Sequence, residues 1–94
     1  MFETHFFLKA VASCDDPLSK TNCKAGMPVV RGTDWEGGVD DHNKGHPGYG
    51  YVELCLEFIF ARVKWNGTGN SGRYRIGNDG KHELCIFNLD IPPG

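Results

Sequence analysis

Val29-Val30-Arg31-Gly32-Thr33-Asp34-Trp35 is the stretch that decides the predicted fold. In it, a short apolar run is followed by charged and aromatic residues around a glycine, which is the pattern of a brief strand that runs into a tight turn. Two later blocks, residues 63–67 and 74–84, show the same pattern. We therefore predict that the three blocks form facing walls of one small all-β barrel.

The length and composition fit a single small domain. A chain of 94 residues buries only a little over about 60% of its unfolded surface, so its core must be small. Twelve of the 13 glycines lie between Gly26 and Gly80, which indicates many turns. The net charge of -2 predicts no overall attraction to nucleic acid or to an anionic membrane, and it leaves room for a local basic face.

Two features bear on the compartment. Residues 51–65 form the longest apolar-rich run, and charged residues interrupt it, which excludes a transmembrane helix there. Glu3 stands where a signal peptide would carry its basic region. The sequence therefore predicts a cytoplasmic protein or a fragment cut from a longer chain, with a secreted protein as the alternative.

Four cysteines leave the redox state open. They stand at positions 14, 23, 55 and 85, permit three pairings and contain no Cys-x-x-Cys pair of the kind that structural zinc sites use. In a secreted protein, a disulfide between Cys14 and Cys23 would close a small loop. In the cytoplasm, all four would be reduced thiols, which are commonly buried.

The first half of the chain alternates between predicted strands and loops. Residues 3–12 alternate loosely and predict a strand, whereas residues 13–26 are rich in turn formers. Residues 27–31 predict a second strand, with Pro28 near its start, where a missing N–H is tolerated. Residues 32–48 predict a long loop, and loops of this length in compact domains are often functional.

Residues 49–65 give the clearest strand pattern. Its apolar alternation changes phase near Glu57 and Phe58, which marks a tight turn or a bulge. We favour two antiparallel strands joined by a turn there, with Arg62 and Lys64 pointing away from the core. The two predicted apolar faces consist of Val52, Leu54 and Leu56 before the turn and of Ile59, Ala61, Val63 and Trp65 after it.

The last third of the chain predicts two short strands, at residues 73–76 and 84–87. A glycine-rich hairpin loop precedes the first strand, and the turn at residues 77–80 separates the two. No segment has the apolar spacing of a long helix. We therefore divide the chain into three parts, which are an N-terminal extension (1–25), a barrel (26–88) and a C-terminal tail (89–94).

Three ordered blocks give the sequence a family resemblance. They are the phrase at residues 29–35, then Trp65-Asn66-Gly67, and finally Tyr74-Arg75-Ile76-Gly77-Asn78-Asp79-Gly80-Lys81 followed by Glu83-Leu84. In these blocks the chain resembles the mind bomb/HERC (MIB/HERC) domain, a module of large ubiquitin ligases. The resemblance covers about residues 26–87. It departs from the family pattern at Gly37, where a second tryptophan is usual, and at Asn66, which follows Trp65 without the usual aspartate between them.

The resemblance implies a fold and a function. It implies a small barrel like that of Src-homology-3 (SH3) domains. In mind bomb proteins such domains hold short peptides from the cytoplasmic tails of Notch ligands. The ligase chemistry resides in other domains of those proteins, so the resemblance implies a binding module and no catalytic residues in this chain.

The candidate site is an aromatic groove for an extended peptide, with arginines that attract acidic side chains. The predicted ligand contacts are Trp35, Tyr51, Arg62, Tyr74 and Arg75. The residues predicted to have structural roles are Arg31, Gly32, Asp34, Trp65, Gly77 and Gly80. For Asp34, the sequence permits either capping of backbone amides or pairing with Arg31 or Arg75.

We predict neither a cofactor nor a metal. Residues 67–72 match Gly-x-Gly-x-x-Gly, but the segment that follows is too short for the helix that a dinucleotide site requires. The acidic and histidine residues of the long loop lack the ligand spacing of a calcium loop, so we interpret them as solvated charges. These loop residues are Asp34, Asp40, Asp41, His42 and His46.

Two function hypotheses follow. The first is a non-catalytic module that recognises a peptide or protein segment, a second copy of the chain included, and that serves substrate capture in a ubiquitin ligase. The alternative is a secreted, disulfide-stabilised structural or assembly domain that uses the same barrel. In that case Asn66-Gly67-Thr68, which is a glycosylation sequon, would carry a sugar.

Overall fold

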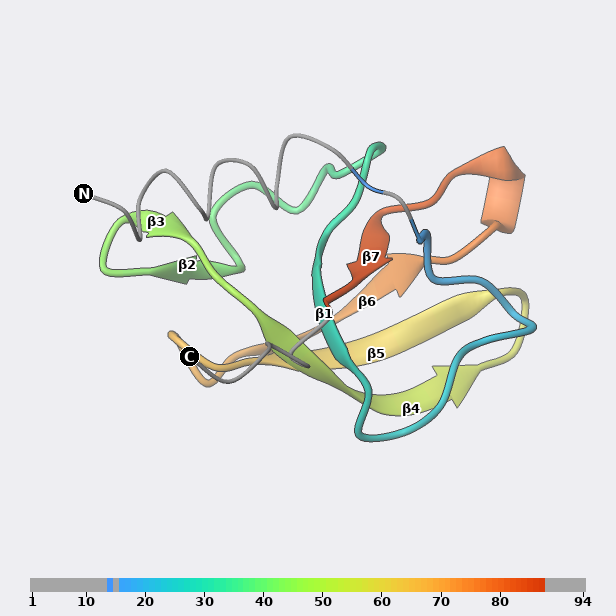
Figure 1. Ribbon diagram of the computed structural model, residues 1–94, viewed down its shortest axis with the longest axis horizontal. Coiled ribbons are helices and arrows are strands. Elements are labelled where there is room, and N and C mark those ends of the chain that lie inside the picture. Colours follow the sequence, from blue (N-terminus) through green and yellow to red (C-terminus); the bar gives the residue numbers. More distant parts are fainter. Residues whose placement is uncertain (1–13, 15, 88–94) are drawn as a thin grey trace, which may run out of the picture.

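The computed structural model describes residue 14 and residues 16–87 (Figure 1). The elements in chain order are β1 (Pro28–Arg31), β2 (His42–Asn43), β3 (His46–Pro47), β4 (Gly50–Leu56), β5 (Phe60–Trp65), β6 (Ser71–Arg75), the 3-10 helix η1 (Asn78–Gly80) and β7 (Leu84–Ile86). This part of the chain is all-β, as the sequence predicts. The predicted strand at residues 3–12 and the predicted tail at 89–94 lie outside the described residues.

One five-stranded antiparallel sheet forms the body of the molecule. Its strand order is β6-β5-β4-β1-β7, with a separate two-stranded sheet of β2 and β3 beside it. Val29 in β1 pairs with Gly50 of β4 on one side and with Ile86 of β7 on the other. Arg31 of the first sequence block pairs with Leu84 at the end of the third block, so these two blocks are neighbours in the sheet.

The sheet is bent but does not close into a complete barrel. Within the described residues, the edge strands β6 and β7 approach each other through an isolated bridge between Ile76 and His82. The backbone N–H of Glu83 also donates to the carbonyl oxygen of Arg75, at 2.9 Å. In Figure 1, β6 and β7 accordingly lie together on the same side of β5.

The β4–β5 hairpin confirms the turn predicted from the phase change. Residues 57–59 form the turn, and Leu56 pairs with Phe60 across it. Phe58 and Ile59 both have positive φ, of 61° and 64°. This conformation is uncommon for non-glycine residues and is an outlier for a β-branched one, so the turn holds local strain.

A β-bulge at Glu53 corrects one prediction about β4. The register shifts between Val52 and Leu54, so side chains after the bulge change face. Val52 is buried in the core, whereas the Leu54 side chain is 54% exposed. The prediction that Val52, Leu54 and Leu56 share one face is therefore wrong, because an extra residue reverses the alternation.

The core lies on the inner face of the bent sheet. Trp65 and Val63 of β5 are fully buried there, which confirms their predicted core role. Leu18 packs into the same core, and its N–H donates to the carbonyl oxygen of Leu84 at 3.0 Å. Part of the segment predicted as an N-terminal extension thus contributes to the core. The buried cluster consists of Leu18, Val29, Val52, Ala61, Val63, Trp65, Tyr74, Ile76 and Leu84.

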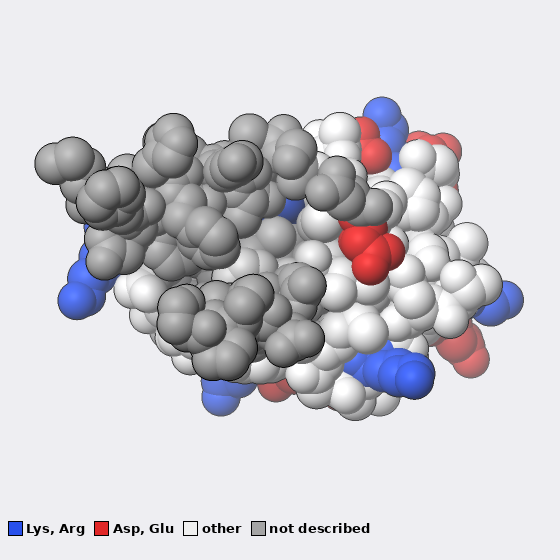
Figure 2. All heavy atoms as spheres, viewed as in Figure 1, with Lys and Arg blue, Asp and Glu red and all other residues white. Residues whose placement is uncertain are grey.

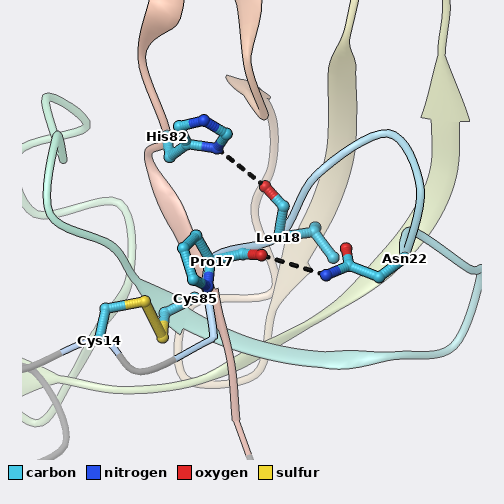
Figure 3. The surroundings of a disulfide bond; sticks show 6 residues. All are labelled: Cys14, Pro17, Leu18, Asn22, His82 and Cys85. Carbon is cyan, nitrogen blue, oxygen red and sulfur yellow. Dashed lines mark hydrogen bonds between the residues drawn. A yellow bond between two sulfur atoms is a disulfide. The ribbon is translucent and has the colours of Figure 1, made fainter.

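The disulfide pairing differs from the predicted one. Cys14 pairs with Cys85, and Cys23 pairs with Cys55. The predicted Cys14–Cys23 bond is wrong because residues near Pro17 lie against β7, where Pro17 and Cys85 form an isolated bridge. In Figure 3, the Cys14–Cys85 bond lies beside this contact.

In the described part of the chain, no helix has the length and apolar character that a bilayer span needs.

Candidate functional site

Three predicted site residues form an aromatic cluster. Trp35, from the loop after β1, stacks on Tyr74 of β6 with ring centroids 5.2 Å apart. The Trp65 ring meets both of them edge-on, at 5.5 Å from Trp35 and 5.6 Å from Tyr74. Pairs of this geometry add stability beyond the buried area, so the cluster fixes the loop onto the sheet.

The hydroxyl of Tyr74 is fully engaged. It accepts a hydrogen bond from Trp65 Nε1 at 2.8 Å and donates one to Asp40 Oδ2 at 2.9 Å. Burial raises the pKa of Tyr74; the Trp65 hydrogen bond partly opposes this rise, and Asp40 adds to it. The Tyr74 side chain is only 3% exposed. This placement gives the ring a core role, although the sequence predicts it as a ligand contact.

Arg31 holds the long loop through a buried ion pair. Its Nε lies 2.8 Å from Asp41 Oδ2, and its Nη2 lies 2.8 Å from Asp41 Oδ1. The Asp41 side chain has no exposed area, so it is not the solvated loop charge that the sequence predicts. The Arg31 guanidinium also lies 5.2 Å from the Trp35 ring centroid, in a cation–π contact. These contacts give Arg31 a structural role.

Glu83 joins β6 to the loop after β1. Its carboxylate accepts hydrogen bonds from Arg75 Nε at 2.8 Å, from the Arg75 backbone N–H at 3.0 Å and from the Glu36 N–H at 3.3 Å. Glu36 Oε1 forms a second ion pair with Arg75 Nη2 at 3.1 Å. The hydrogen bond with Glu83 is the main reason why the pKa of Arg75 is raised. Two carboxylates thus already balance the charge of Arg75.

The turn after β1 docks directly onto the segment before β7. Asp34 Oδ2 accepts a hydrogen bond from the His82 N–H at 2.8 Å, and the Asp34 N–H donates to the His82 carbonyl oxygen at 3.1 Å. Asp34 therefore caps a backbone amide, which is one of the two roles that the sequence permits. A Cβ atom at Gly32 would lie 2.8 Å from Leu84 N, so the close approach requires glycine.

Glycines also shape the turn between β6 and β7. Gly77 precedes η1 with a φ of 132°, and Gly80 ends η1 with a φ of 71°. Both angles lie in a region that L-side chains rarely adopt. Both glycines therefore occupy positions that fit their predicted structural role.

The outer sheet face presents a different surface, on the side of β4, β5 and β6 that points away from the core. It combines exposed apolar groups with cations. Tyr51 is 39% and Leu54 is 54% exposed. We define the outer sheet face by Tyr51, Leu54, Phe60, Arg62, Lys64 and Arg73, which the strand registers place as neighbours.

Among the described residues, acids pair with only part of the charge of the outer sheet face. Arg73 lies 4.8 Å from the Phe60 ring centroid. Arg62 Nε forms an exposed ion pair with Glu53 Oε1 at 3.1 Å, and the same oxygen accepts from Ser71 Oγ at 2.9 Å. No ion pair of Lys64 or Arg73 with a described acid is found. The face is therefore locally basic in an acidic protein.

An aromatic group borders the outer sheet face at the start of β4. Tyr49 and Tyr51 meet edge-on with centroids 5.6 Å apart, and Phe87 lies 5.8 Å from Tyr49. Burial, and then the neighbouring Tyr51, raise the pKa of Tyr49. Tyr49 therefore stays neutral at physiological pH, and the two rings extend the apolar part of the surface.

The five predicted ligand contacts thus fall into two places. Tyr51 and Arg62 lie on the outer sheet face, and Arg75 lies at the edge of the same face, opposite Phe60, where Glu83 and Glu36 hold it. Trp35 and Tyr74 belong to the aromatic cluster that braces the long loop. Leu54 is the surface residue that the sequence analysis missed, because its exposure depends on the bulge. The sequence does carry a signal that Tyr74 is buried, because Tyr74 alternates in phase with Ile76, which is buried.

A small pocket lies at the other end of the β4–β5 hairpin. Its volume is about 360 Å³, and it is lined by Lys20, Leu56, Glu57, Phe58, Ile59 and Ile76. The Phe58 side chain is 77% exposed at its rim. Lysine and glutamate lie among apolar residues here, so the pocket has no clear charge preference.

The described residues offer no cluster of three or more histidine, cysteine, aspartate and glutamate side chains that could hold a metal ion.

On the face that Figure 2 shows, acidic and basic side chains are interspersed, with uncharged surface between them. The geometry therefore describes a small all-β domain with a braced loop and an apolar, locally basic sheet face.

Comparison with known proteins relates the chain to one group. It is 39% identical over 70 residues to HERC2-like protein 3 of Homo sapiens, a match that covers 73% of this chain and 6% of the relative. It is 40% identical over 69 residues to the E3 ubiquitin-protein ligase HERC2 of Mus musculus, covering 72% of this chain. The human E3 ubiquitin-protein ligase HERC2 is 41% identical over 67 residues, covering 70% of this chain.

The chain is therefore a partial homologue of HERC2 proteins. The match spans only 1% of the two HERC2 ligases, so it concerns one small segment of very long proteins. No protein-family model matches the chain.

Proposed function

We propose that this chain is a non-catalytic recognition module of the MIB/HERC type, which binds an acidic protein segment on the outer sheet face. The observation that carries the proposal is the combination of exposed Tyr51 and Leu54 with the cations Arg62, Lys64 and Arg73. Such a surface offers apolar contact and charge attraction to an extended segment that alternates acidic and apolar residues.

The energetics favour a few contacts near the centre of this surface. Tyrosine and arginine are the residues that most often carry binding energy at interfaces. Tyr51 has a rigid ring, and among the described residues Arg62 pairs with the exposed Glu53, so a ligand carboxylate competes with a weak surface ion pair. Trp35 and Arg75 remain predicted contacts at the margin, since both are partly buried and already have protein partners.

The fold type is part of the proposal. A bent antiparallel sheet, whose edge strands meet at the Ile76–His82 bridge, is compatible with a small SH3-like barrel. The similarity to HERC2 segments supports a place in ubiquitin ligases, where the module would capture substrates while other domains perform the transfer. The boundary at residue 88 is proposed with it, whereas the N-terminal boundary moves from residue 25 to a point before Leu18, which belongs to the core.

Selection from a random peptide library would test this function. The immobilised chain, with both disulfides intact, should enrich peptides in which aspartate or glutamate alternates with aliphatic or aromatic residues. The double variant Arg62→Glu, Arg73→Glu reverses two charges of the outer sheet face and should lose this enrichment. The matched control is Lys24→Glu, Lys81→Glu, which makes the same charge change at exposed positions elsewhere.

The two variants separate a specific surface from general charge attraction. Enrichment that survives in the control and disappears in the face variant supports the proposal. Enrichment of neutral or basic peptides, or equal enrichment by both variants, would place the binding surface elsewhere.

A further inference from the structure

Asn66-Gly67-Thr68 is the single Asn-x-Ser/Thr sequence in the 94 residues. This sequence is the acceptor for N-linked glycosylation when the middle residue is not proline. Short motifs arise by chance, so the sequence alone does not distinguish a used acceptor from an unused one. The structure supplies two further observations, which concern the position of the sequon and the state of the cysteines.

The sequon occupies the turn between β5 and β6. Asn66 and Thr68 are both exposed, so a sugar attached to Asn66 would extend into solvent. The backbone of the turn is well anchored, because the Asn66 N–H donates to the Tyr49 carbonyl oxygen at 2.9 Å. Thr68 Oγ1 donates to the Asp40 carbonyl oxygen at 3.3 Å. A glycan at Asn66 would therefore displace no core side chain.

The cysteines point to an oxidising compartment. All four are paired, as Cys14–Cys85 and Cys23–Cys55, so no free thiol remains. The bonds join residues 71 and 32 positions apart in the sequence, and each ties the segment before β1 to a strand of the sheet. Paired cysteines of this kind persist where the environment is oxidising, which is also where N-linked glycans are added.

The Cys14–Cys85 disulfide lies at a contact between the segment that follows Cys14 and strand β7. Pro17 pairs with Cys85, and the Pro17 carbonyl oxygen accepts a hydrogen bond from Asn22 Nδ2 at 3.2 Å (Figure 3). A ring nitrogen of His82 lies 3.3 Å from the Leu18 carbonyl oxygen. Residues 16–18 are held against β7 by backbone hydrogen bonds between Leu18 and Leu84 and between Ile86 and Asp16, and these contacts position Cys14 beside its partner.

We propose that the chain matures in an oxidising compartment and carries an N-linked glycan on Asn66. The proposal favours the alternative compartment that the sequence leaves open. It does not rest on the recognition function, because the outer sheet face could bind a partner in this compartment too. A glycan on Asn66 would, however, exclude the proposed substrate capture in a ubiquitin ligase, because that reaction takes place in the reducing cytoplasm.

The chemistry of both modifications is defined. In glycosylation, Asn66 Nδ2 forms a bond to the anomeric carbon of a lipid-linked oligosaccharide. The bond from that carbon to the pyrophosphate breaks, and the lipid pyrophosphate leaves with the amide proton. In oxidation, the four thiols release four electrons and four protons, which reduce two disulfides of a thiol-exchange oxidant to two dithiol pairs.

The position of the glycan leaves the other surfaces open. The β5–β6 turn and the β4–β5 turn lie at opposite ends of β5, so the sugar would be remote from Phe58 and its pocket. The outer sheet face lies along the strands between the two turns. A glycan at Asn66 would therefore leave the centre of this face uncovered.

Mass analysis of the protein isolated from its natural source tests the proposal directly. The intact mass should exceed the sequence mass by whole hexose and N-acetylhexosamine units. Peptide N-glycosidase should remove this increment and convert Asn66 to aspartate. Reduction should then add four hydrogen atoms, and a non-reduced peptide map should show the Cys14–Cys85 and Cys23–Cys55 linkages. An unmodified Asn66, or four thiols that react with an alkylating reagent before reduction, would overturn the proposal.

Variants expressed through a eukaryotic secretory pathway show whether the sequon is the acceptor. Asn66→Gln should abolish the increment, and Thr68→Ser should retain it because serine is accepted at this position. Asn70→Gln is the matched control, since Asn70 is exposed in the same turn but lies outside the sequon. Equal glycosylation of wild type and Asn66→Gln would overturn the assignment. Because glycosylation precedes secretion, the intracellular pool gives the same readout for a variant that is not exported.

Discussion

Trp65 Nε1 donates a buried hydrogen bond to the Tyr74 hydroxyl oxygen at 2.8 Å. This bond joins the inner sides of β5 and β6. The Tyr74 hydroxyl in turn donates a hydrogen bond to Asp40 in the long loop. One side chain therefore links the core to the loop that Arg31 and Asp41 hold from the other side. The arrangement explains why the loop between β1 and β4 is ordered although its own strands are only two residues long.

Replacing Tyr74 with phenylalanine should destabilise the protein. The ring remains, but the buried Trp65 N–H loses its acceptor, which costs about 1–3 kcal/mol. Equilibrium urea unfolding followed by tryptophan fluorescence measures the change. Tyr51→Phe serves as control, because the exposed ring should contribute within about 0.5 kcal/mol. Equal stability of Tyr74→Phe and wild type would contradict the importance of this bond.

The same variant should change the alkaline pH dependence of stability. Burial and Asp40 raise the pKa of Tyr74 in the folded state, whereas the pKa of a tyrosine in the unfolded state is about 10. Above that pH, the unfolded state binds fewer protons than the folded one, so stability falls as pH rises, by up to about 1.4 kcal/mol per pH unit. The difference between wild type and Tyr74→Phe should therefore shrink above pH 10. Parallel profiles would show that Tyr74 ionises equally in both states.

Removing the charge of Asp41 should cost more than removing that of Glu53. Asp41→Asn leaves Arg31 without its bidentate partner, and breaking a buried pair costs about 3 kcal/mol or more. We expect the low end of that range because part of the Arg31 side chain reaches water. Glu53→Gln removes an exposed pair and should change stability by less than about 1 kcal/mol. Thermal unfolding of both variants measures the contrast, and equal losses would contradict it.

Each disulfide should stabilise the fold. Chain-entropy arguments give about 4 kcal/mol for loops of this length, with native strain reducing the value. The double variants Cys14→Ser, Cys85→Ser and Cys23→Ser, Cys55→Ser should each lower the urea midpoint, and a phosphine reductant should lower the midpoint of wild type further. A midpoint that does not respond to the reductant would mean that the bonds contribute nothing to stability.

The sequence predicts the parts of the fold that depend on local alternation. The phase change near Glu57 places the hairpin turn, and the phase of Ala61, Val63 and Trp65 identifies the core side of β5. The bulge at Glu53 could not be predicted, because one extra residue in a strand leaves the apolar pattern almost unchanged. Its effect on Leu54 is large, since it moves that side chain from the core to the surface.

Contacts between distant segments were beyond sequence reasoning. The cysteine pairing depends on the segment before β1 lying against β7 and β4, which spacing alone does not reveal. The pair Arg31–Asp41 depends in the same way on how the long loop folds back. These contacts divide the predicted groove: Tyr51, Arg62 and Arg75 lie on the outward side of the sheet, with Arg75 held by two carboxylates, whereas Trp35 and Tyr74 pack under the long loop.

Binding at the outer sheet face is measured by the affinity for a selected acidic peptide, determined by fluorescence anisotropy. We predict that Arg62→Glu, Arg73→Glu raises the Kd at least about tenfold, which corresponds to about 1.4 kcal/mol, and that higher salt weakens binding. Lys24→Glu, Lys81→Glu should leave the Kd within about twofold of wild type, because both lysines lie outside the outer sheet face. An unchanged Kd in the first variant, or an equal loss in both, would contradict the account.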